Sequence, residues 1–368
     1  MTHPPDCTLT TACFDLSVYA SNARDLITAI NSMSVLLEVP CYLVIFCDKY
    51  TVKQIKHLRN EVFGNEHLTK YIEIGFEDIW TYFLKDKVSK NRTIYFPTQT
   101  KRSSVEKHLI CCNKFDFVLF SIYWNPFQTT LFGWIDANLG INAKIVRIDY
   151  QKNTLLNVLN NLSPNHFQIQ VLNVCDKKYK NPKHKKEYYA FNRWVVCGGF
   201  FTTNKQCGIP ILNRLKDIFV ETTLQGFGHN EEMLYLEILD EFQDKIKKSY
   251  GDYCHIFNNF THQTKGFLYV YKKVICKYFE FQYYKECIDC CETMLLEYDD
   301  VKFVDDMCVS IYIKYYLSHI FSNSDHTQEV FKKIQTIMAQ NKHNQEVFSN
   351  KFSQYPQYSH LFVEGFFL

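Results

Sequence analysis

An acidic residue, Asp136, follows the apolar run of the stretch LFGWIDANLG at residues 131–140. Asn138 comes two positions later, so both side chains project to the same side if the extended backbone continues. Carboxylate and amide oxygens in such an Asp-x-Asn pair are suitable ligands for a hard divalent ion that also binds a diphosphate. The alternative is an Asx turn that ends a buried strand, and for Asp136 taken alone this turn is the simpler interpretation.

Two further carboxylates, Glu231 and Glu232, lie in the stretch HNEEMLYLEILDEF at residues 229–242, whose apolar periodicity predicts a helix. They are either acids that the helix dipole favours in a first turn, or one of them is a general base. For Glu231 the two interpretations are equally supported. Three histidines flank these segments and are interpreted as surface or loop residues: His229, His255 and His262.

The elements that must position these acids begin with a β-α-β pattern. Residues 8–16 and 41–48 predict strands, and a helical spacing of apolar residues separates them. The run CYLVIFCD has the length and composition of a strand buried on both faces, which indicates a parallel sheet. Asp15 and Asp48 end these two strands, and ligands of such sheets gather at the carboxyl ends of the strands.

The middle of the chain continues the pattern with a helix at residues 107–124 and strands at 129–135, 143–150 and 166–174. The stretch EYYAFNRWVVCGGFFTTN then predicts a strand that meets a turn at Gly198 and Gly199. Glycine at this point indicates a backbone that comes close to another group or bends sharply.

Helical periodicity dominates from residue 267 onward. The text YFEFQYYKECIDCCETMLLEY is similar to one helical hairpin of a tetratricopeptide array, with the helix break at residues 280–282. We therefore predict two domains, 1–266 and 267–368. One or two such hairpins do not form a free solenoid, so we expect the tail to pack on the first domain.

Composition places the chain among folded proteins and excludes several classes of function. Hydrophobic residues make up 46% and charged residues 22%, and the net charge of +2 provides no general attraction to nucleic acid or anionic membranes. No window approaches the about 18 consecutive apolar residues of a membrane span, and no secretory signal begins the chain. Fifteen cysteines then indicate reduced thiols, and we predict a cytoplasmic protein. The chain has no P-loop, dinucleotide fingerprint or nucleophile elbow.

The order of the motifs resembles the HtrL/YibB-like family of glycosyltransferases over about residues 8–260, and more distantly the nucleotide-sugar-dependent transferases of the GT-A fold. The matching features are, in chain order, TACFDL, LVIFCD, Arg59, NKFDFVLFSIYWNPFQTTLFGWIDANLG, YYAFNRWVVCGGFF, HNEEMLYLEIL and YGDYCHIFNNF. The resemblance implies an α/β fold with a GT-A-like, Rossmann-type mixed sheet flanked by helices. The helical C-terminal extension falls outside it.

The resemblance also implies roles for particular residues. Asp136 corresponds to the acid that holds the metal and the diphosphate, with Asn138 as the second metal ligand in place of the usual aspartate. Glu231 corresponds to a carboxylate near the sugar, and Glu232 is its substitute. The cofactor-binding residues implied by the resemblance are Thr11, Ala12, Phe14, Asp15, Asp48, Arg59, Lys114, Asn125, Trp134, Asp136, Gly198 and Gly199, of which the two glycines lie next to the acceptor side.

The function that these expectations describe is transfer of a sugar from a nucleoside-diphosphate sugar to an acceptor hydroxyl, assisted by Mn²⁺ or Mg²⁺. A UDP-sugar is the favoured donor, and the acceptor is a glycan, a protein or a lipid. Such a transfer develops positive charge at the anomeric carbon and negative charge on the leaving phosphate, so a cation and a carboxylate are both needed. The alternatives are a degenerate GT-A-fold sugar-binding or scaffold protein, whose helical tail contacts a protein partner or a second copy, and a nucleotide-sugar hydrolase.

Overall fold

The structure, a computed structural model, describes residues 4–20, 25–94, 104–137, 139, 151–251, 256–260, 268–297, 306–340 and 342–361. The chain forms two compact units. Unit 1 consists of Met1–Asn173 and Lys177–Thr264, and unit 2 of Val174–Asp176 and Lys265–Leu368. None of the helices in the described ranges is long and apolar enough to cross a membrane.

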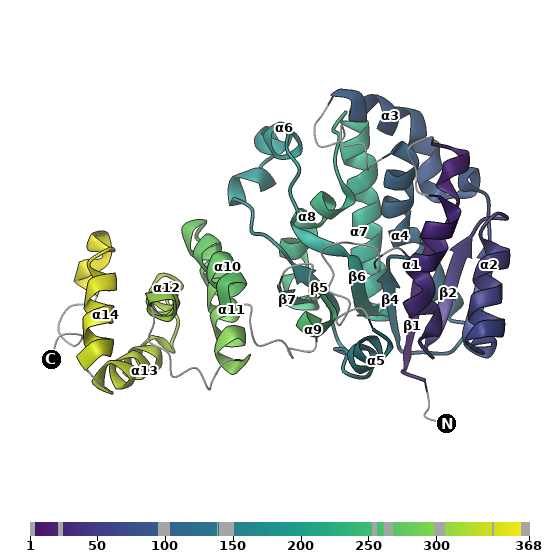
Figure 1. The fold of residues 1–368 in the computed structure, drawn as a ribbon. Helices are drawn as coiled ribbons and strands as arrows, with labels where there is room; N and C mark the ends of the chain where they lie inside the picture. The colour runs from purple at the N-terminus through teal and green to yellow at the C-terminus, as the bar shows by residue number, and fades with distance from the viewer. Residues whose placement is uncertain are drawn as a thin grey trace. The chain divides into compact units, whose positions relative to one another are not determined.

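Unit 1 is built on one mixed sheet, to which the described residues contribute seven strands in the order β3-β2-β1-β4-β6-β5-β7 (Figure 1). Strand β6 runs antiparallel to its neighbours β4 and β5, and the other pairs are parallel. The strands are β1 (Cys7–Cys13), β2 (Tyr42–Cys47), β3 (Thr69–Glu73), β4 (Leu131–Ile135), β5 (Phe167–Val171), β6 (Val196–Asn204) and β7 (Ile246–Tyr250).

The order of the strands reverses at β1. The chain proceeds from β1 to β2 and β3 on one side, and later places β4 on the other side of β1. The carboxyl ends of β1, β2 and β4 therefore lie at one edge of the sheet, and β6 begins at that edge because it is antiparallel. Such a reversal point is where open α/β sheets bind their ligands.

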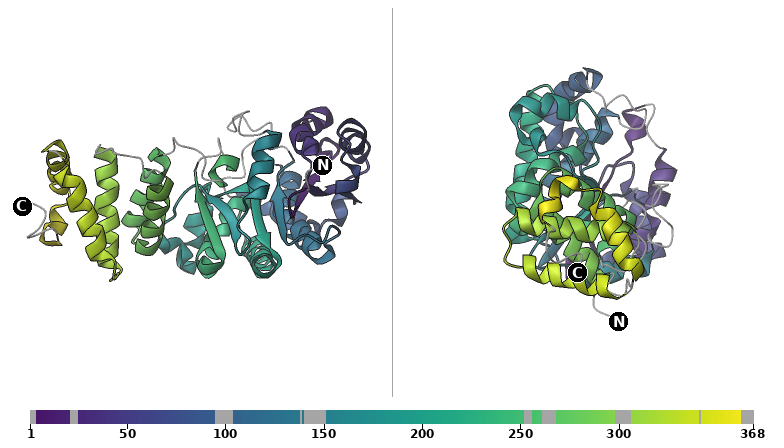
Figure 2. Two further views of the ribbon diagram at one scale, coloured as in Figure 1. Left: turned by 90° about the horizontal axis from the view of Figure 1, so that it is seen from below. Right: turned by 90° about the vertical axis from the view of Figure 1, so that its left-hand side faces the viewer.

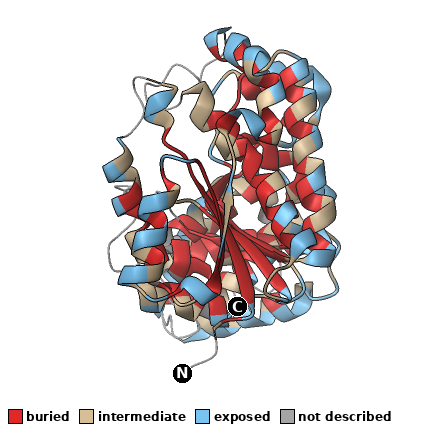
Figure 3. Cartoon of the chain, turned by 90° about the vertical axis from the view of Figure 1, so that its right-hand side faces the viewer, coloured by how far each residue is buried: buried red, intermediate tan, exposed pale blue. Residues whose placement is uncertain are grey.

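Helices cover both faces of the sheet, and its inner strands are buried between them (Figure 3), whereas the edge strand β3 is partly exposed. Helices α1, α5 and α9 share a core with alternate strand residues such as Leu9 and Leu43. Helix α4 lies on the other face, where Thr10 of β1 donates a hydrogen bond to Ser121 at 2.8 Å. The helices of unit 1 are α1 (Leu26–Glu38), α2 (Val52–Lys56), α3 (Lys85–Ile94), α4 (Val105–Trp124), α5 (Lys152–Asn160), α6 (Lys185–Tyr189), α7 (Lys205–Leu224), α8 (Tyr235–Glu241) and α9 (Ile256–Phe260).

Unit 2 is helical in all its described ranges from residue 268 onward, and its successive helices pack on one another (Figure 2). The predicted hairpin is confirmed: α10 and α11 are separated by a short turn in which Gln282 has a φ of 61°. The helices are α10 (Leu268–Glu280), α11 (Tyr284–Glu297), α12 (Asp306–Phe321), α13 (Thr327–Ala339) and α14 (Lys342–Phe352), followed by a 3-10 helix at Pro356–Leu361.

The predicted fold class, a mixed sheet flanked by helices with a helical C-terminal region, is confirmed. The turn predicted at Gly198 and Gly199 is wrong, because β6 passes through both glycines without a break. The strand predicted at residues 143–150 lies outside the described residues.

Candidate active site

A fully buried lysine, Lys114, connects the acidic residues that the sequence separates by almost a hundred positions. Its ammonium donates hydrogen bonds to the Gly198 carbonyl at 2.7 Å and to Oε1 of Glu231 at 2.8 Å. Oδ1 of Asp136 lies 3.5 Å from the same nitrogen. Helix α4, strand β6, the segment before α8 and the end of β4 thus meet at one point of the carboxyl edge.

Asp136 lies at the outer side of this cluster. Its side chain is 30% exposed, whereas the Lys114 side chain is 1% exposed and that of Glu231 is 10% exposed. The indole of Trp134 donates a hydrogen bond of 2.6 Å to Oδ1 of Asp136, and the Asp136 amide donates to the Gly199 carbonyl at 2.8 Å. The carboxylate is therefore held in one orientation while part of it remains open to solvent.

The two glycines of β6 are required by close packing rather than by a turn. A Cβ atom on Gly198 would lie 1.9 Å from Oε1 of Glu231, and one on Gly199 would lie 3.3 Å from Oδ2 of Asp136. The expected close approach of the backbone to another group is therefore present. The absence of Cβ atoms at these two positions lets the carboxylates of Glu231 and Asp136 pack against the strand.

Glu232 and Tyr235 complete the buried side of the cluster. Oε1 of Glu232 accepts a hydrogen bond from the Gly198 amide at 3.3 Å. The Tyr235 hydroxyl is buried and has no hydrogen-bond partner among the described residues. Tyr235 is not among the predicted site residues. Its position four residues after Glu231 is nevertheless the helical spacing that places two side chains on one face.

Burial and neighbouring charges shift the pKa values of Lys114, Glu231 and Glu232 by different amounts. Burial lowers the pKa of Lys114, but Asp136 and Glu231 raise it by more, so the pKa of Lys114 lies well above its usual value. Burial raises the pKa of Glu231, while Lys114 opposes this change. Burial and then the neighbouring Glu231 raise the pKa of Glu232 well above its usual value. One ammonium therefore lies among the carboxyl groups of Asp136, Glu231 and Glu232.

The predicted donor-site residues of the first two strands reach the same edge. The Asp15 amide donates to Oδ2 of Asp48 at 2.8 Å, and Oδ1 of Asp48 accepts from the Thr51 amide at 2.9 Å. Asp48 therefore links the ends of β1 and β2. Phe14 stacks on Phe117 of α4 with ring centroids 6.4 Å apart. Thr11 and Ala12 are buried within β1, and the Thr11 hydroxyl has no hydrogen-bond partner in the described part of the chain.

Arg59 does not belong to this edge, contrary to expectation. Its buried guanidinium donates to the carbonyls of Leu37, Val39 and Cys41 at 2.6–2.7 Å, and Cys41 immediately precedes β2. The side chain is therefore occupied by backbone oxygens at the opposite end of the strand. Its role is to satisfy carbonyls where α1 ends and β2 begins.

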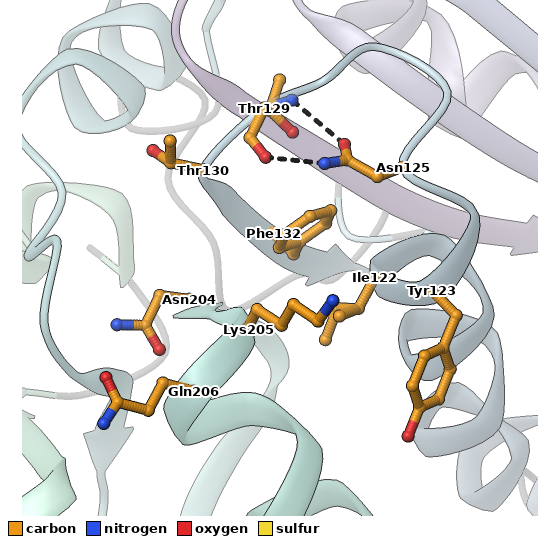
Figure 4. A pocket seen from close by; sticks show the side chains of 9 residues that line it. All are labelled: Ile122, Tyr123, Asn125, Thr129, Thr130, Phe132, Asn204, Lys205 and Gln206. Carbon is orange, nitrogen blue, oxygen red and sulfur yellow. Dashed lines mark hydrogen bonds between the residues drawn. The ribbon is translucent and has the colours of Figure 1, made fainter.

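Asn125 also lies at the opposite edge. Its side chain donates to the Thr129 carbonyl at 3.1 Å and accepts from the Thr129 amide at 3.0 Å, as Figure 4 shows. These residues border a pocket of about 400 Å³ between the start of β4 and the start of α7. The described residues that line the pocket include no carboxylate and no histidine: they are Ile122, Tyr123, Asn125, Thr129, Thr130, Phe132, Asn204, Lys205 and Gln206.

The metal prediction concerns Asp136 and Asn138, and Asn138 lies outside the described residues. Asp136 fits such a role because Oδ1 faces Trp134 and Lys114, while Oδ2 has no hydrogen-bond partner in the described ranges. A Mg²⁺-like ion bound to substrate phosphates needs only one or two protein carboxylates.

His229 lies in the loop before Glu231, as the loop interpretation predicts, but it is not a surface residue, because it is only 2% exposed. His255 and His262 lie outside the described residues.

No family model matches the sequence, and no curated protein matches it. Two solved structures that are similar to the chain are glycosyltransferases. The galactosyltransferase LgtC, in complex with donor and acceptor sugar analogues, is 10% identical with a TM-score of 0.34, over 66% of this chain and 73% of that chain. Mouse xyloside xylosyltransferase 1, in its apo form, is 13% identical with a TM-score of 0.34, over 66% of this chain and 84% of that chain. A similarity this low identifies neither activity nor substrate, so the function has to be inferred from the site itself.

Proposed function

We propose that the chain is a glycosyltransferase that moves a sugar from a nucleoside-diphosphate sugar to an acceptor hydroxyl. The observation that carries this proposal is the meeting of Asp136, Lys114 and Glu231 at the carboxyl edge, beside the point where the strand order reverses. Sugar transfer needs positive charge near the departing phosphate and a carboxylate near the acceptor. This edge supplies both within one cluster.

In the proposed mechanism Asp136 anchors the diphosphate end of the donor. Its carboxylate is the most exposed of the cluster, and Trp134 fixes its direction. A divalent ion such as Mn²⁺ or Mg²⁺, when bound by Asp136, would neutralise the charge that develops on the leaving phosphate. Lys114 adds a fixed positive charge behind Asp136, and this charge needs no reorganisation during the reaction.

Glu231 is the proposed carboxylate on the acceptor side. Burial raises the pKa of Glu231. A carboxylate with a raised pKa is a stronger base, and a general base works best when its pKa is near the working pH. Lys114 holds one oxygen of Glu231 at 2.8 Å and opposes this rise in pKa. The pKa of Glu232 beside it is raised well above its usual value, so we assign the two neighbouring carboxyl groups different roles.

The first two strands provide the proposed nucleoside-binding part of the donor site at the carboxyl edge. Thr11, Ala12, Phe14 and Asp15 bring β1 to the edge beside Asp136, and Asp48 fixes the end of β2 against it. A UDP-sugar is the favoured donor. The glycine pair of β6, next to Glu231 and Asp136, lies on the proposed acceptor side.

The test is to incubate the full chain with a panel of UDP-, GDP- and other nucleotide sugars and Mn²⁺ or Mg²⁺, and to measure free nucleoside diphosphate with and without added acceptor sugars. Release that increases with an acceptor supports the proposal. No release from any donor, together with no thermal shift from UDP or GDP plus metal, contradicts it. A thermal shift without release indicates instead a sugar-binding protein that has lost catalysis, and release that is independent of acceptor indicates a hydrolase.

A further inference from the structure

A second cluster of buried side chains, separate from the carboxylates, lies between α4 and the segment before α8. His108 and Cys112 are four residues apart on α4, so they share a helix face, and His229 approaches them from a distant part of the chain. One ligand atom from each of the three lies within 4.8 Å of the other two. All three side chains are buried.

The distances are close to those of a metal site. Zn–S and Zn–N bonds of about 2.3 and 2.0 Å place sulfur and nitrogen ligands about 3.5 Å apart in a tetrahedral arrangement. Nε2 of His108 already lies 3.6 Å from Sγ of Cys112. The other ligand atoms are at most 4.8 Å apart. Side-chain rotations that move them by on the order of 1 Å would bring them to the separations of a tetrahedral site.

Both histidines have lowered pKa values, so a metal ion does not compete with a proton for their ring nitrogens. Burial and then the Arg92 guanidinium lower the pKa of His108 well below its usual value, and the pKa of His229 to about 3. Both rings are therefore neutral and each has a free lone pair. Nδ1 of His229 has no hydrogen-bond partner among the described residues, although it is buried. Leaving a buried polar atom unpaired is unfavourable, so this ring lacks one interaction.

We propose that His108, Cys112 and His229 bind a soft d¹⁰ metal ion, Zn²⁺ or Cu⁺. One thiol and two imidazoles are the donor types that both ions accept, whereas oxygen ligands suit Mg²⁺, Ca²⁺ and Mn²⁺ better. On binding, the Cys112 thiol releases its proton to solvent and its sulfur forms the metal bond. Cu⁺ with one thiolate is neutral, while Zn²⁺ leaves one positive charge near Arg92, whose Nη1 donates to the His229 carbonyl at 3.0 Å.

The ion would connect the two segments that carry the acid–lysine pair. Cys112 precedes Lys114 by two residues, and His229 precedes Glu231 by two. A metal bridge at this position restrains α4 against the start of η9 (Glu231–Leu234), and thereby stabilises the Lys114–Glu231 contact of 2.8 Å. This site is independent of the Asp136 metal prediction, because it uses different residues and a different class of ion.

The test uses the full chain, kept reduced, stripped with a chelator and then exposed without oxygen to Zn²⁺ or Cu⁺ before desalting. We expect one retained ion per chain, a higher melting temperature in the loaded form, and a thiolate-to-cobalt absorption band when Co²⁺ replaces Zn²⁺. Cys112→Ser and His229→Gln should each abolish retention. Cys111→Ser is the matched control, because Cys111 is adjacent but does not belong to the cluster, and it should retain the ion.

No retained ion in the wild-type chain, or undiminished retention in Cys112→Ser, would overturn the proposal. X-ray absorption of the zinc-loaded wild-type chain gives an answer that does not depend on a variant that folds. One sulfur and two nitrogen neighbours support the site. Three or four sulfur neighbours show that the ion is held by other cysteines and contradict it.

Discussion

The Asp136 carboxylate is the group of the cluster that a ligand reaches most directly. Asp136→Asn keeps the oxygen that accepts the Trp134 hydrogen bond but removes the negative charge. We expect a loss on the order of 100-fold in kcat, because the carboxylate that would hold a cation at the departing phosphate is lost, with little change in melting temperature. Nucleoside diphosphate release and thermal unfolding measure the two effects. Asp217→Asn removes an exposed carboxylate of α7 and should leave both unchanged; equal turnover of Asp136→Asn and wild type would refute the assignment.

Lys114 and Glu231 form a buried ion pair, so the loss of one partner leaves the other charge uncompensated. Lys114→Met should lower the free energy of unfolding by about 3–5 kcal/mol. The double variant Lys114→Met with Glu231→Gln removes both charges and should recover a large part of that loss, as urea unfolding of the four proteins would show. Additive effects of the two substitutions would mean that the pair is not coupled in solution.

Glu232 makes the stability of the chain depend on pH. Its folded-state pKa is raised above the ordinary value of 4.5, so the folded chain retains a proton that the unfolded chain releases. Its stabilising contribution is complete below pH 4.5 and decreases as pH rises toward the folded-state pKa. Glu232→Gln mimics the protonated form and should therefore become more stable than wild type as pH increases. Denaturant unfolding from pH 4.5 to pH 8 measures this divergence. The exposed Glu77→Gln should follow the wild-type profile, and a parallel profile for Glu232→Gln would contradict the prediction.

Strand β6 offers a matched pair of substitutions. Gly198→Ala places a methyl group 1.9 Å from Oε1 of Glu231, whereas Gly199→Ala meets Cδ1 of Leu139 at 3.1 Å and Oδ2 of Asp136 at 3.3 Å. We expect Gly198→Ala to displace Glu231, abolish turnover and lower the free energy of unfolding by about 1–3 kcal/mol. Gly199→Ala should be milder in both measurements. The reverse order of severity would show that Glu231 does not occupy the space beside β6.

The elements that sequence could predict are those whose burial is complete. Strands β1, β2, β4 and β5 lie inside the sheet. Strands β2 and β4 read as nearly continuous apolar runs, and β1 (CTLTTAC) and β5 (FQIQV) have apolar or β-branched residues at most positions. The sequence does not reveal β3 and β7, because they are the edge strands and their sequences, TKYIE and IKKSY, carry charges and polar groups. The π-helical segment His57–Val62 likewise has no separate signal in the helical pattern that contains it.

The same distinction applies to the site. Asp136 and Glu231 are acids at ends of elements, so a pattern of strand ends and helix starts could identify them. Arg59 and Asn125 were misplaced because their partners are backbone groups, which any residue supplies and no motif encodes. The buried state of His229 depends on packing against α4, more than a hundred residues away, and no local pattern predicts it.

The division of the chain into two units gives a prediction for the whole molecule. Lys114, Asp136 and Glu231 all belong to unit 1, whereas Val174–Asp176, which lie between β5 and α6 in the sequence, belong to unit 2. A chain that ends at Thr264 therefore keeps the complete acid–lysine cluster but separates this buried internal segment from the rest of its unit. We expect a lower melting temperature than that of the full chain, and a thermal shift from UDP with Mn²⁺ that persists. Calorimetry of both chains, with and without nucleotide, measures these two quantities separately. An unchanged melting temperature would show that the helical unit is an independent module. A folded truncated chain that no longer responds to nucleotide would show instead that unit 2 contributes to the donor site.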